Sequence, residues 1–245
     1  MTDSPDGNQL PDIAVVTMRS DATPQNATYL LMNVLSELTA VSLVTVMLSE
    51  ESEIHGNYDV TEIAHGAKAN GLLATVLLFA RNQLRLCGAI RRFDAPVIYL
   101  FGGTAYSLPI VFAKLIGKTV VVQPRGDVPL TLQLEWEEQY PDIVARALAN
   151  SVRLLEFGSL WAADRIVTYT ESMAEELGLG RFREKLYPHG TRYIALNEEF
   201  TPRTPIENRD RRVGVIGRLD IEKGGEELIE GGERPPSNIT FPFCG

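Results

Sequence analysis

Residues 97–127 have the sequence VIYLFGGTAYSLPIVFAKLIGKTVVVQPRGD, and this stretch decides the fold class. An apolar run at Val97–Phe101 is followed by a Gly-Gly turn, a segment of helical length at Ser107–Ile116 and a second apolar run at Thr119–Gln123. Gly117 can end the helix, because glycine adopts the left-handed backbone of a helix C-terminus without strain. The order strand, helix, strand is typical of a βαβ unit with two parallel strands. The nearly continuous apolar run TVVVQ indicates a strand that is covered on both faces.

The same alternation extends in both directions from this unit. Short apolar runs rich in β-branched residues predict further strands at Asp12–Met18, Val41–Leu48 and Arg165–Tyr169. Two shorter strands are expected at Asp59–Ile63 and Lys185–Pro188. Between them, apolar residues at helical spacing predict helices at Ala27–Leu38 (with Asn26 as N-cap), at Asn70–Arg92, at Leu134–Ala162 (broken near Pro141) and from Thr170 or Glu171 to about Gly178. We therefore expect the α/β class, with a Rossmann-like domain built on a parallel sheet.

The alternation stops near residue 190 and starts again near residue 212. Residues 191–211 are polar, contain two prolines and show no periodicity, so they are predicted to be a linker. After them the sequence predicts a strand at Arg212–Ile216, a helix at Glu226–Gly231 and a strand at Asn238–Phe243. We expect an N-terminal Rossmann-like domain at residues 1–190 and the start of a second one at residues 212–245. Two strands and one helix would leave that second domain incomplete, because its sheet edges lack neighbours.

Composition narrows the function. The net charge is −9, from 32 acidic and 23 basic residues, which argues against nucleic acid as a partner. Two cysteines provide no disulfide framework, and the three histidines lack metal-ligand spacing, so neither a metal nor another cofactor is expected. Four arginines, Arg81, Arg85, Arg91 and Arg92, fall on one predicted helix, where a solvated face is the simplest interpretation.

The N-terminal residues Met1–Pro11 are polar and acidic, unlike a signal peptide. No apolar segment is both long and uninterrupted enough to cross a bilayer, which takes about 20 residues. We therefore expect a cytoplasmic protein without a transmembrane segment. Peripheral contact with the inner face of the membrane remains open.

The segment with the most chemical content is VIGRLDIEKGG, residues 215–225. A predicted strand leads into a loop that holds Arg218 and Lys223, with Gly217 and Gly224 beside them. The helix predicted after this loop begins with free N–H groups and a positive dipole end, both of which favour anions. An arginine can grip two phosphate oxygens with its planar fork, and a lysine adds a point charge. The pattern favours a diphosphate site, with an ordinary charged loop as the alternative.

Two other places are candidates. Arg125, Gly126 and Asp127 follow a predicted strand, and open α/β sheets bind ligands beyond the carboxyl ends of their strands. Arg125 would bind a phosphate of a ligand and Asp127 would orient a hydroxyl of a ligand, or the two would form a salt-bridged loop pair. His189 and Gly190 lie at the predicted domain crossover, where His189 would contact a nucleotide or simply fill a turn.

Gly217-Arg218-Leu219 followed by Glu222-Lys223-Gly224 resembles the donor-phosphate loop of the family 4 glycosyltransferases, which have the GT-B fold. Three further segments are similar to motifs of that family and stand in the same order: Pro124–Asp127, Ala163–Leu177 and Tyr187–Thr191. The resemblance covers most of residues 85–245. It implies a metal-independent, retaining transfer of sugar from a nucleotide-sugar donor to a glycan, lipid-linked or small-molecule acceptor. It also implies that Arg218 and Lys223 contact the donor diphosphate.

The sequence departs from the family pattern in three places. Residues 19–25 lack the glycines that many members have after the first strand, and His189 replaces the usual asparagine. The family's paired glutamates would lie beyond residue 245, so we expect a chain truncated within the donor domain, whose own activity is open. Two alternatives remain: an inactive remnant or binding module, and a nucleotide-sugar epimerase of GT-B architecture. An open reading frame beyond codon 245 that encodes the two glutamates would favour a truncated enzyme.

Overall fold

The computed structural model describes residues 10–18, 22–49, 52–63, 71–190, 204–208, 215–216 and 243–244. The chain divides into two compact units, Met1–Ile194 and Ala195–Gly245.

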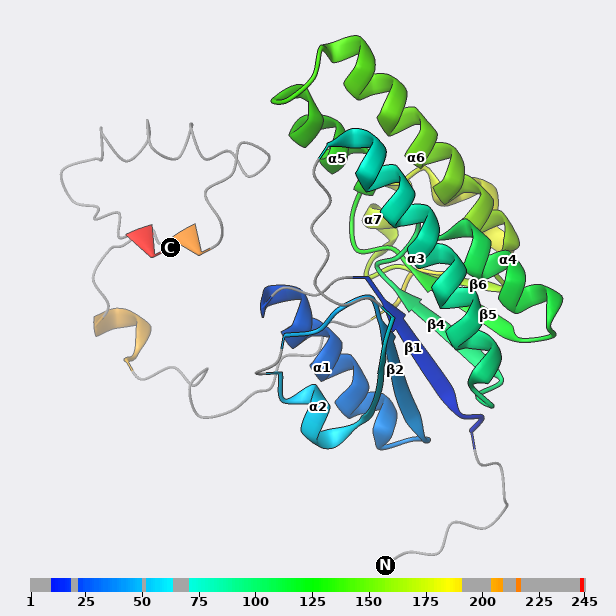
Figure 1. Cartoon of the computed structure of the whole chain (residues 1–245). Coiled ribbons are helices and arrows are strands. Elements are labelled where there is room, and N and C mark those ends of the chain that lie inside the picture. Colours follow the sequence, from blue (N-terminus) through cyan, green and yellow to red (C-terminus); the bar gives the residue numbers. More distant parts are fainter. Residues whose placement is uncertain are drawn as a thin grey trace, which may run out of the picture. The chain divides into compact units, whose positions relative to one another are not determined.

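Unit 1 is built on a seven-stranded sheet in which every pair of neighbouring strands is parallel (Figure 1). The strand order is β3-β2-β1-β4-β5-β6-β7. The strands are β1 (Ile13–Thr17), β2 (Val41–Thr45), β3 (Asp59–Glu62), β4 (Val97–Phe101), β5 (Thr119–Gln123), β6 (Arg165–Val167) and β7 (Leu186–Tyr187). The predicted parallel sheet is confirmed, although β2 ends at Thr45, three residues before the predicted end. The order reverses direction between β1 and β4, which makes this the topological switch point of the sheet.

Helices of very different lengths separate the strands (Figure 1). They are α1 (Ala22–Ser36), α2 (Ile54–Asn57), α3 (Leu72–Arg92), α4 (Ser107–Leu115), α5 (Val128–Glu137), α6 (Asp142–Ala162), α7 (Glu171–Glu176) and the 3-10 helix η1 (Leu179–Lys185). Helices α3, α4 and α6 cover one face of the sheet, and α1 covers the other. Helix α4 packs against α3 on one side and against α6 on the other.

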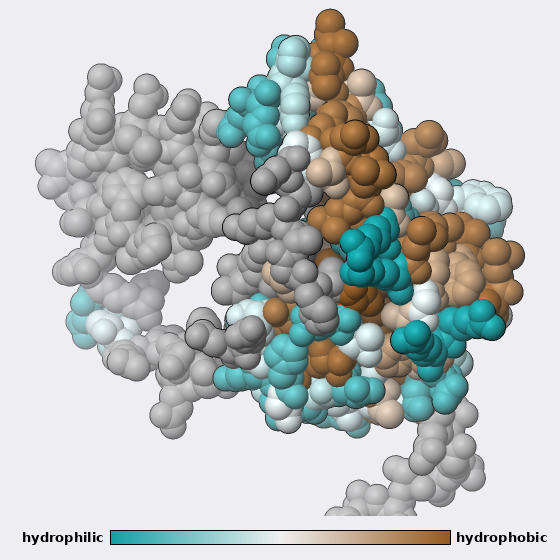
Figure 2. Space-filling model, viewed as in Figure 1, coloured by the Kyte–Doolittle hydropathy of each residue, from teal (hydrophilic) through white to brown (hydrophobic). Residues whose placement is uncertain are grey.

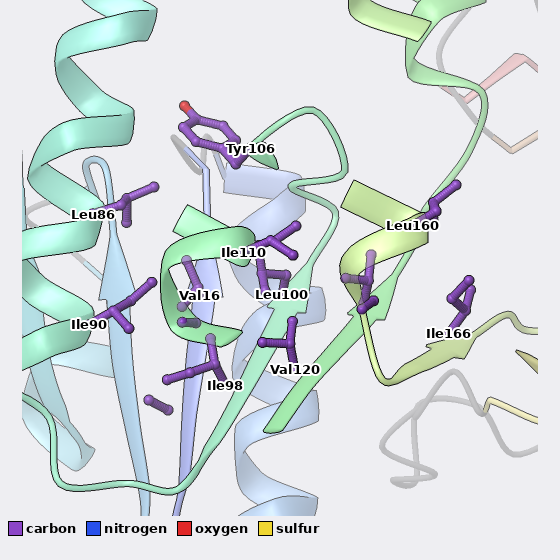
Figure 3. Packing of buried hydrophobic residues seen from close by; sticks show 14 of the residues in the cluster. Val16, Leu86, Ile90, Ile98, Leu100, Tyr106, Ile110, Val120, Leu160 and Ile166 are labelled. Carbon is purple, nitrogen blue, oxygen red and sulfur yellow. The ribbon is translucent and has the colours of Figure 1, made fainter. Parts of the chain in front are cut away.

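The larger apolar core lies between the sheet and the layer of α3, α4 and α6. Figure 3 shows helix residues directed at the central strands: Leu86 and Ile90 from α3 and Ile110 from α4, above Val16, Ile98, Leu100 and Val120. All of these side chains are buried. On the opposite face, Leu31 and Met32 of α1 pack against Val15 and Leu43. Since both faces of β1 carry buried residues, its continuous apolar sequence is explained.

Two helix predictions were wrong at their starts. Helix α1 begins at Ala22, so Asn26 lies inside the helix and does not cap it. Pro24 falls within the first turn, where proline's missing N–H costs nothing. The segment predicted as one broken helix forms two helices, and the first, α5, starts at Val128 because Asp127 caps it.

Unit 2 contains a described pair of parallel strands, β8 (Val215–Ile216) and β9 (Phe243–Cys244). A short 3-10 helix, η3 (Ile206–Asn208), falls within the predicted linker. The helix predicted at Glu226–Gly231 lies outside the described residues. No helix in the described part of the chain is long and apolar enough to cross a membrane.

Candidate functional site

Three central strands end side by side at the carboxyl edge of the sheet. Thr17 of β1 pairs with Phe101 of β4, and Phe101 pairs with Gln123 of β5, so the last residues of these strands form one row. Since the strand order reverses between β1 and β4, this row borders the switch point, where open α/β sheets leave a crevice for ligands. The carboxyl edge between β1 and β5 is therefore the candidate site.

Buried polar side chains gather at this edge. Gln123 accepts a hydrogen bond from the Tyr99 hydroxyl, and the Thr45 hydroxyl donates to the carbonyl of Met18 at 3.0 Å. The Thr17 side chain is 4% exposed, and its hydroxyl has no hydrogen-bond partner within the described residues. A buried hydroxyl without a partner costs free energy, and Asn82 Oδ1 and Thr104 Oγ1 share this state among the described residues. Sequence patterns missed Thr17, because its place beside β4 follows only from the strand order.

Gly102 joins the ends of β4 and β5. Its backbone has a φ of +82°, which glycine tolerates and other residues rarely adopt, and its N–H donates to the carbonyl of Gln123 at 2.9 Å. A Cβ placed on Gly102 would lie 2.9 Å from Cδ of Arg125. The sequence indicated only a turn here. In the structure this turn holds the loop after β5 against the switch point.

Arg125 lies at the carboxyl end of β5, as the sequence predicted. Its guanidinium carbon is 4.9 Å from the centre of the Phe101 ring, a cation–π contact that fixes the side chain over the end of β4. Such stacking occupies the face of the guanidinium and leaves its in-plane N–H donors available to a ligand. Among the described residues, Arg125 forms no ion pair with Asp127.

Asp127 both caps a helix and lines a cavity. Its Oδ1 accepts a hydrogen bond from the Leu130 N–H at 2.9 Å, which makes it the N-cap of α5. It also lines a cavity of about 360 Å³ together with Arg153 and Glu156 of α6 and Arg181 of η1. Gly126, beside it, would accept a Cβ without any contact inside 4 Å, so the space there does not require glycine.

Glu156 is the titratable group of this cavity with a displaced pKa. Burial raises the pKa of its carboxyl, and the nearby Asp127 charge raises it further. The Thr104 hydroxyl and the Arg153 guanidinium lower the pKa of Glu156, but by less than burial and Asp127 raise it. A half-buried carboxyl beside a second carboxyl is an arrangement that favours holding a proton, and such groups are common at functional sites. Sequence analysis missed Glu156 because no short motif surrounds it.

His189 and Gly190 follow β7. His189 lines a cavity of about 980 Å³ together with Glu171 and Glu175 of α7 and Arg183 of η1. The Gly190 N–H donates to the carbonyl of Thr168 at 2.8 Å. A Cβ on Gly190 would lie 2.8 Å from Cγ1 of Val167 and 2.9 Å from that carbonyl oxygen. The chain after β7 is thus packed directly against the carboxyl end of β6.

The predicted diphosphate residues Gly217, Arg218, Lys223 and Gly224 lie outside the described residues. Strand β8 ends at Ile216, immediately before Gly217 in the sequence, and pairs in parallel with β9. The described ranges contain no group of three or more His, Cys, Asp or Glu side chains placed to hold a metal ion.

No family model and no curated protein sequence matches the chain. Solved structures do resemble it. The apo lipopolysaccharide outer core galactosyltransferase WaaB has a TM-score of 0.56 at 10% identity, over 95% of this chain and 60% of its own length. UGT2 of Phytolacca americana, solved with UDP-2-fluoroglucose and pterostilbene, has a TM-score of 0.57 at 11% identity, over 95% and 72%. A putative UDP-N-acetylglucosamine 2-epimerase from Listeria monocytogenes has a TM-score of 0.52 at 14% identity, over 95% and 62%.

At these identities the likeness defines the fold. The seven-stranded parallel sheet with its flanking helices is the Rossmann-like architecture of GT-B proteins. The chain spans 60% of the length of the galactosyltransferase. Because both a galactosyltransferase and an epimerase occur among these neighbours, the fold does not choose between the two activities.

Proposed function

We propose that this protein is a glycosyltransferase that moves a sugar from a nucleotide-sugar donor to an acceptor, and that it follows the pattern of family 4. The observation that carries the proposal is the loop at residues 217–224. In this loop Arg218 and Lys223 follow a parallel strand, β8, in a chain of GT-B fold. The loop after a parallel strand is where such folds bind phosphates.

Arg218 and Lys223 bind the donor diphosphate in this proposal, with Gly217 and Gly224 letting the backbone approach it. As the bond to the sugar breaks, negative charge accumulates on the departing nucleoside diphosphate. Two fixed cations stabilise that charge more in the transition state than in the ground state, which is how electrostatic catalysis lowers a barrier. Because side-chain cations supply this charge, the proposed transfer needs no metal ion. That the transfer retains the configuration of the sugar is what the resemblance to family 4 implies.

The acceptor, a glycan, a lipid-linked sugar or a small molecule, lies in this proposal at the carboxyl edge of the sheet. Arg125, fixed over Phe101, presents its N–H donors to a phosphate or a sugar hydroxyl. Asp127 uses one carboxylate oxygen to cap α5 and orients an acceptor hydroxyl with the other. The Thr17 hydroxyl, which has no hydrogen-bond partner among the described residues, forms a hydrogen bond with the acceptor in this proposal, and His189 and Gly190 supply a contact to the nucleotide.

An epimerase is the second candidate, because the putative UDP-N-acetylglucosamine 2-epimerase shares the fold at a TM-score of 0.52. The two activities differ in one requirement: a transferase needs an acceptor, whereas an epimerase converts the nucleotide sugar alone. A binding module would bind the nucleotide sugar but would neither transfer nor epimerise the sugar.

The experiment combines binding with turnover. UDP, GDP and ADP are titrated calorimetrically into the 245-residue chain, which is then incubated with UDP-glucose, UDP-galactose and GDP-mannose, with and without acceptors and with and without EDTA. We expect one nucleoside diphosphate to bind, EDTA to have no effect, and any nucleoside diphosphate release to depend on an acceptor. Binding without turnover would support the diphosphate site alone, and conversion of a nucleotide sugar without an acceptor would favour the epimerase. If none of the three nucleoside diphosphates binds, the proposal is overturned.

A further inference from the structure

The helix layer over the larger core has an unusually apolar outer surface. Of the nineteen exposed large apolar side chains in the described part of the chain, fourteen belong to α3, α4, α5 and α6. Helix α1, which covers the opposite face of the sheet, contributes none among its described side chains, residues 25–36. Scattered exposed leucines are ordinary, but a contiguous apolar patch marks an interaction site.

The patch is most continuous over two adjacent helices. We define the α3–α4 face by its exposed side chains: Leu73, Leu77, Arg81, Leu84 and Arg91 from α3, and Leu108, Val111 and Leu115 from α4. On α3 these residues recur at helical spacing opposite the buried Leu86 and Ile90, so they point away from the sheet. Leu73 is 73% exposed and Leu115 is 80% exposed. Figure 2 shows apolar residues gathered over this region, interrupted and bordered by hydrophilic ones.

The charge of this face is opposite to that of the whole chain. Helices α3 and α4 contain four arginines and one lysine and no aspartate or glutamate, although the net charge of the chain is −9. Lys114 forms an ion pair with Asp164, and Arg85 donates a hydrogen bond to the carbonyl of Ile63. Arg81 and Arg91 form no ion pair with any described residue. Exposed leucines among arginines that pair with no described carboxylate fit a partner that is apolar inside and anionic at its surface.

We propose that the α3–α4 face docks on the surface of an anionic lipid bilayer, an interaction that goes beyond the proposed function. Leucines of such a face insert among the acyl chains while arginines contact lipid phosphates, as in interfacial amphipathic helices. A second copy of the chain fits less well. A symmetric contact would bring the arginines of both copies into one interface, with no carboxylate on α3 or α4 to compensate them.

The experiment is flotation of the full 245-residue chain with vesicles of phosphatidylcholine and phosphatidylglycerol, 70:30, with phosphatidylcholine alone for comparison. We expect binding to the anionic vesicles that weakens in high salt and without phosphatidylglycerol. An arginine near an anionic surface contributes about 1 kcal/mol. Arg81→Gln with Arg91→Gln should therefore weaken partitioning about 25-fold, at 1.4 kcal/mol per decade.

Leu77→Ser with Leu115→Ser should weaken partitioning about tenfold or more, since each side chain loses buried apolar area. The matched controls are Leu38→Ser, an exposed leucine in the turn after α1, and Arg183→Gln on η1, both of which should bind like the wild type. Circular dichroism and melting temperature confirm the fold of each variant, and the arginine pair tests the face even if the leucine pair unfolds. Absence of wild-type flotation overturns the proposal, and so do leucine and arginine variants that all bind like the controls. A dimer in sedimentation that Leu77→Ser with Leu115→Ser dissociates would assign the face to a second copy instead.

Discussion

Gly190→Ala tests how tightly the chain after β7 is packed against the edge of the sheet. The new Cβ would lie 2.8 Å from Cγ1 of Val167 and 2.9 Å from the carbonyl oxygen of Thr168, against about 3.5–4.0 Å for an ordinary carbon contact. The carbonyl belongs to the backbone and already accepts a hydrogen bond from Gly190 at 2.8 Å, so it cannot move without weakening that bond. Overpacking of this kind costs about 1–3 kcal/mol, and two close atoms place this change at the upper end.

A domain of this size loses about 2–4 °C of melting temperature per kcal/mol, so Gly190→Ala should lower the melting temperature by about 4–10 °C. The assay is thermal unfolding followed by circular dichroism. Gly126→Ala is the matched control, because a Cβ there meets no atom within 4 Å and the melting temperature should stay within about 1 °C. A Gly190→Ala protein that melts like the wild type would refute the described packing of β6 against the chain after β7.

Three further changes test separate features. Asp127→Ala removes the N-cap of α5 and should lower the free energy of unfolding, measured in urea, by about 0.5–2 kcal/mol. Asp127→Asn should retain most of the stability, because asparagine also caps helices, and an equal loss in both variants would contradict the capping role. Gly88→Ala replaces an exposed glycine inside α3 with open space around it and should raise stability by about 0.5–1 kcal/mol, so a destabilised variant would count against this helix. Partial burial raises the pKa of Asp164, but hydrogen bonds from Lys114 and the Val120 N–H outweigh burial and hold it below the ordinary 3.8. Since the folded-state pKa is depressed, the stabilisation is present above pH 3.8 and is lost as the pH falls through the folded-state value. The melting-temperature difference between wild type and Asp164→Asn should therefore shrink below about pH 4, and a constant difference would argue against the ion pair.

Local sequence was sufficient for the central strands β4 and β5, because their burial makes them continuous apolar runs. β4 and β5 occur at the predicted residues. Helix starts were harder to predict, because several residues near a helix start have the chemistry of an N-cap and only one of them caps the helix. Asn26 has the chemistry of a cap, yet the helix extends past it to Ala22. Asp127, predicted to be a ligand residue or a salt-bridge partner of Arg125, proved to be the cap of α5.

The candidate site was partly predictable for a related reason. Arg125 and Asp127 could be placed at the carboxyl edge because they directly follow a recognisable strand. Thr17, Gly102 and Glu156 could not, since their positions depend on which strands and helices become neighbours. Nothing in the residues around Thr17 shows that β1 pairs with β4, more than 80 residues away.

The central claim is that Arg218 and Lys223 bind a nucleoside diphosphate, and calorimetric titration of Arg218→Ala tests it most directly. A lost charge-assisted contact costs about 1.5–3 kcal/mol, or about tenfold to a hundredfold in affinity. Lys223→Ala should lose somewhat less, and Arg218→Lys should restore only part of the affinity because lysine lacks the planar fork. Arg146→Ala, an exposed arginine of α6, is the matched control and should bind the nucleotide normally. We expect Arg218→Ala to bind the nucleoside diphosphate at least tenfold more weakly than the wild type, at an unchanged melting temperature. An Arg218→Ala protein that melts lower but binds the nucleotide as the wild type does would contradict the central claim and leave the arginine a structural role only.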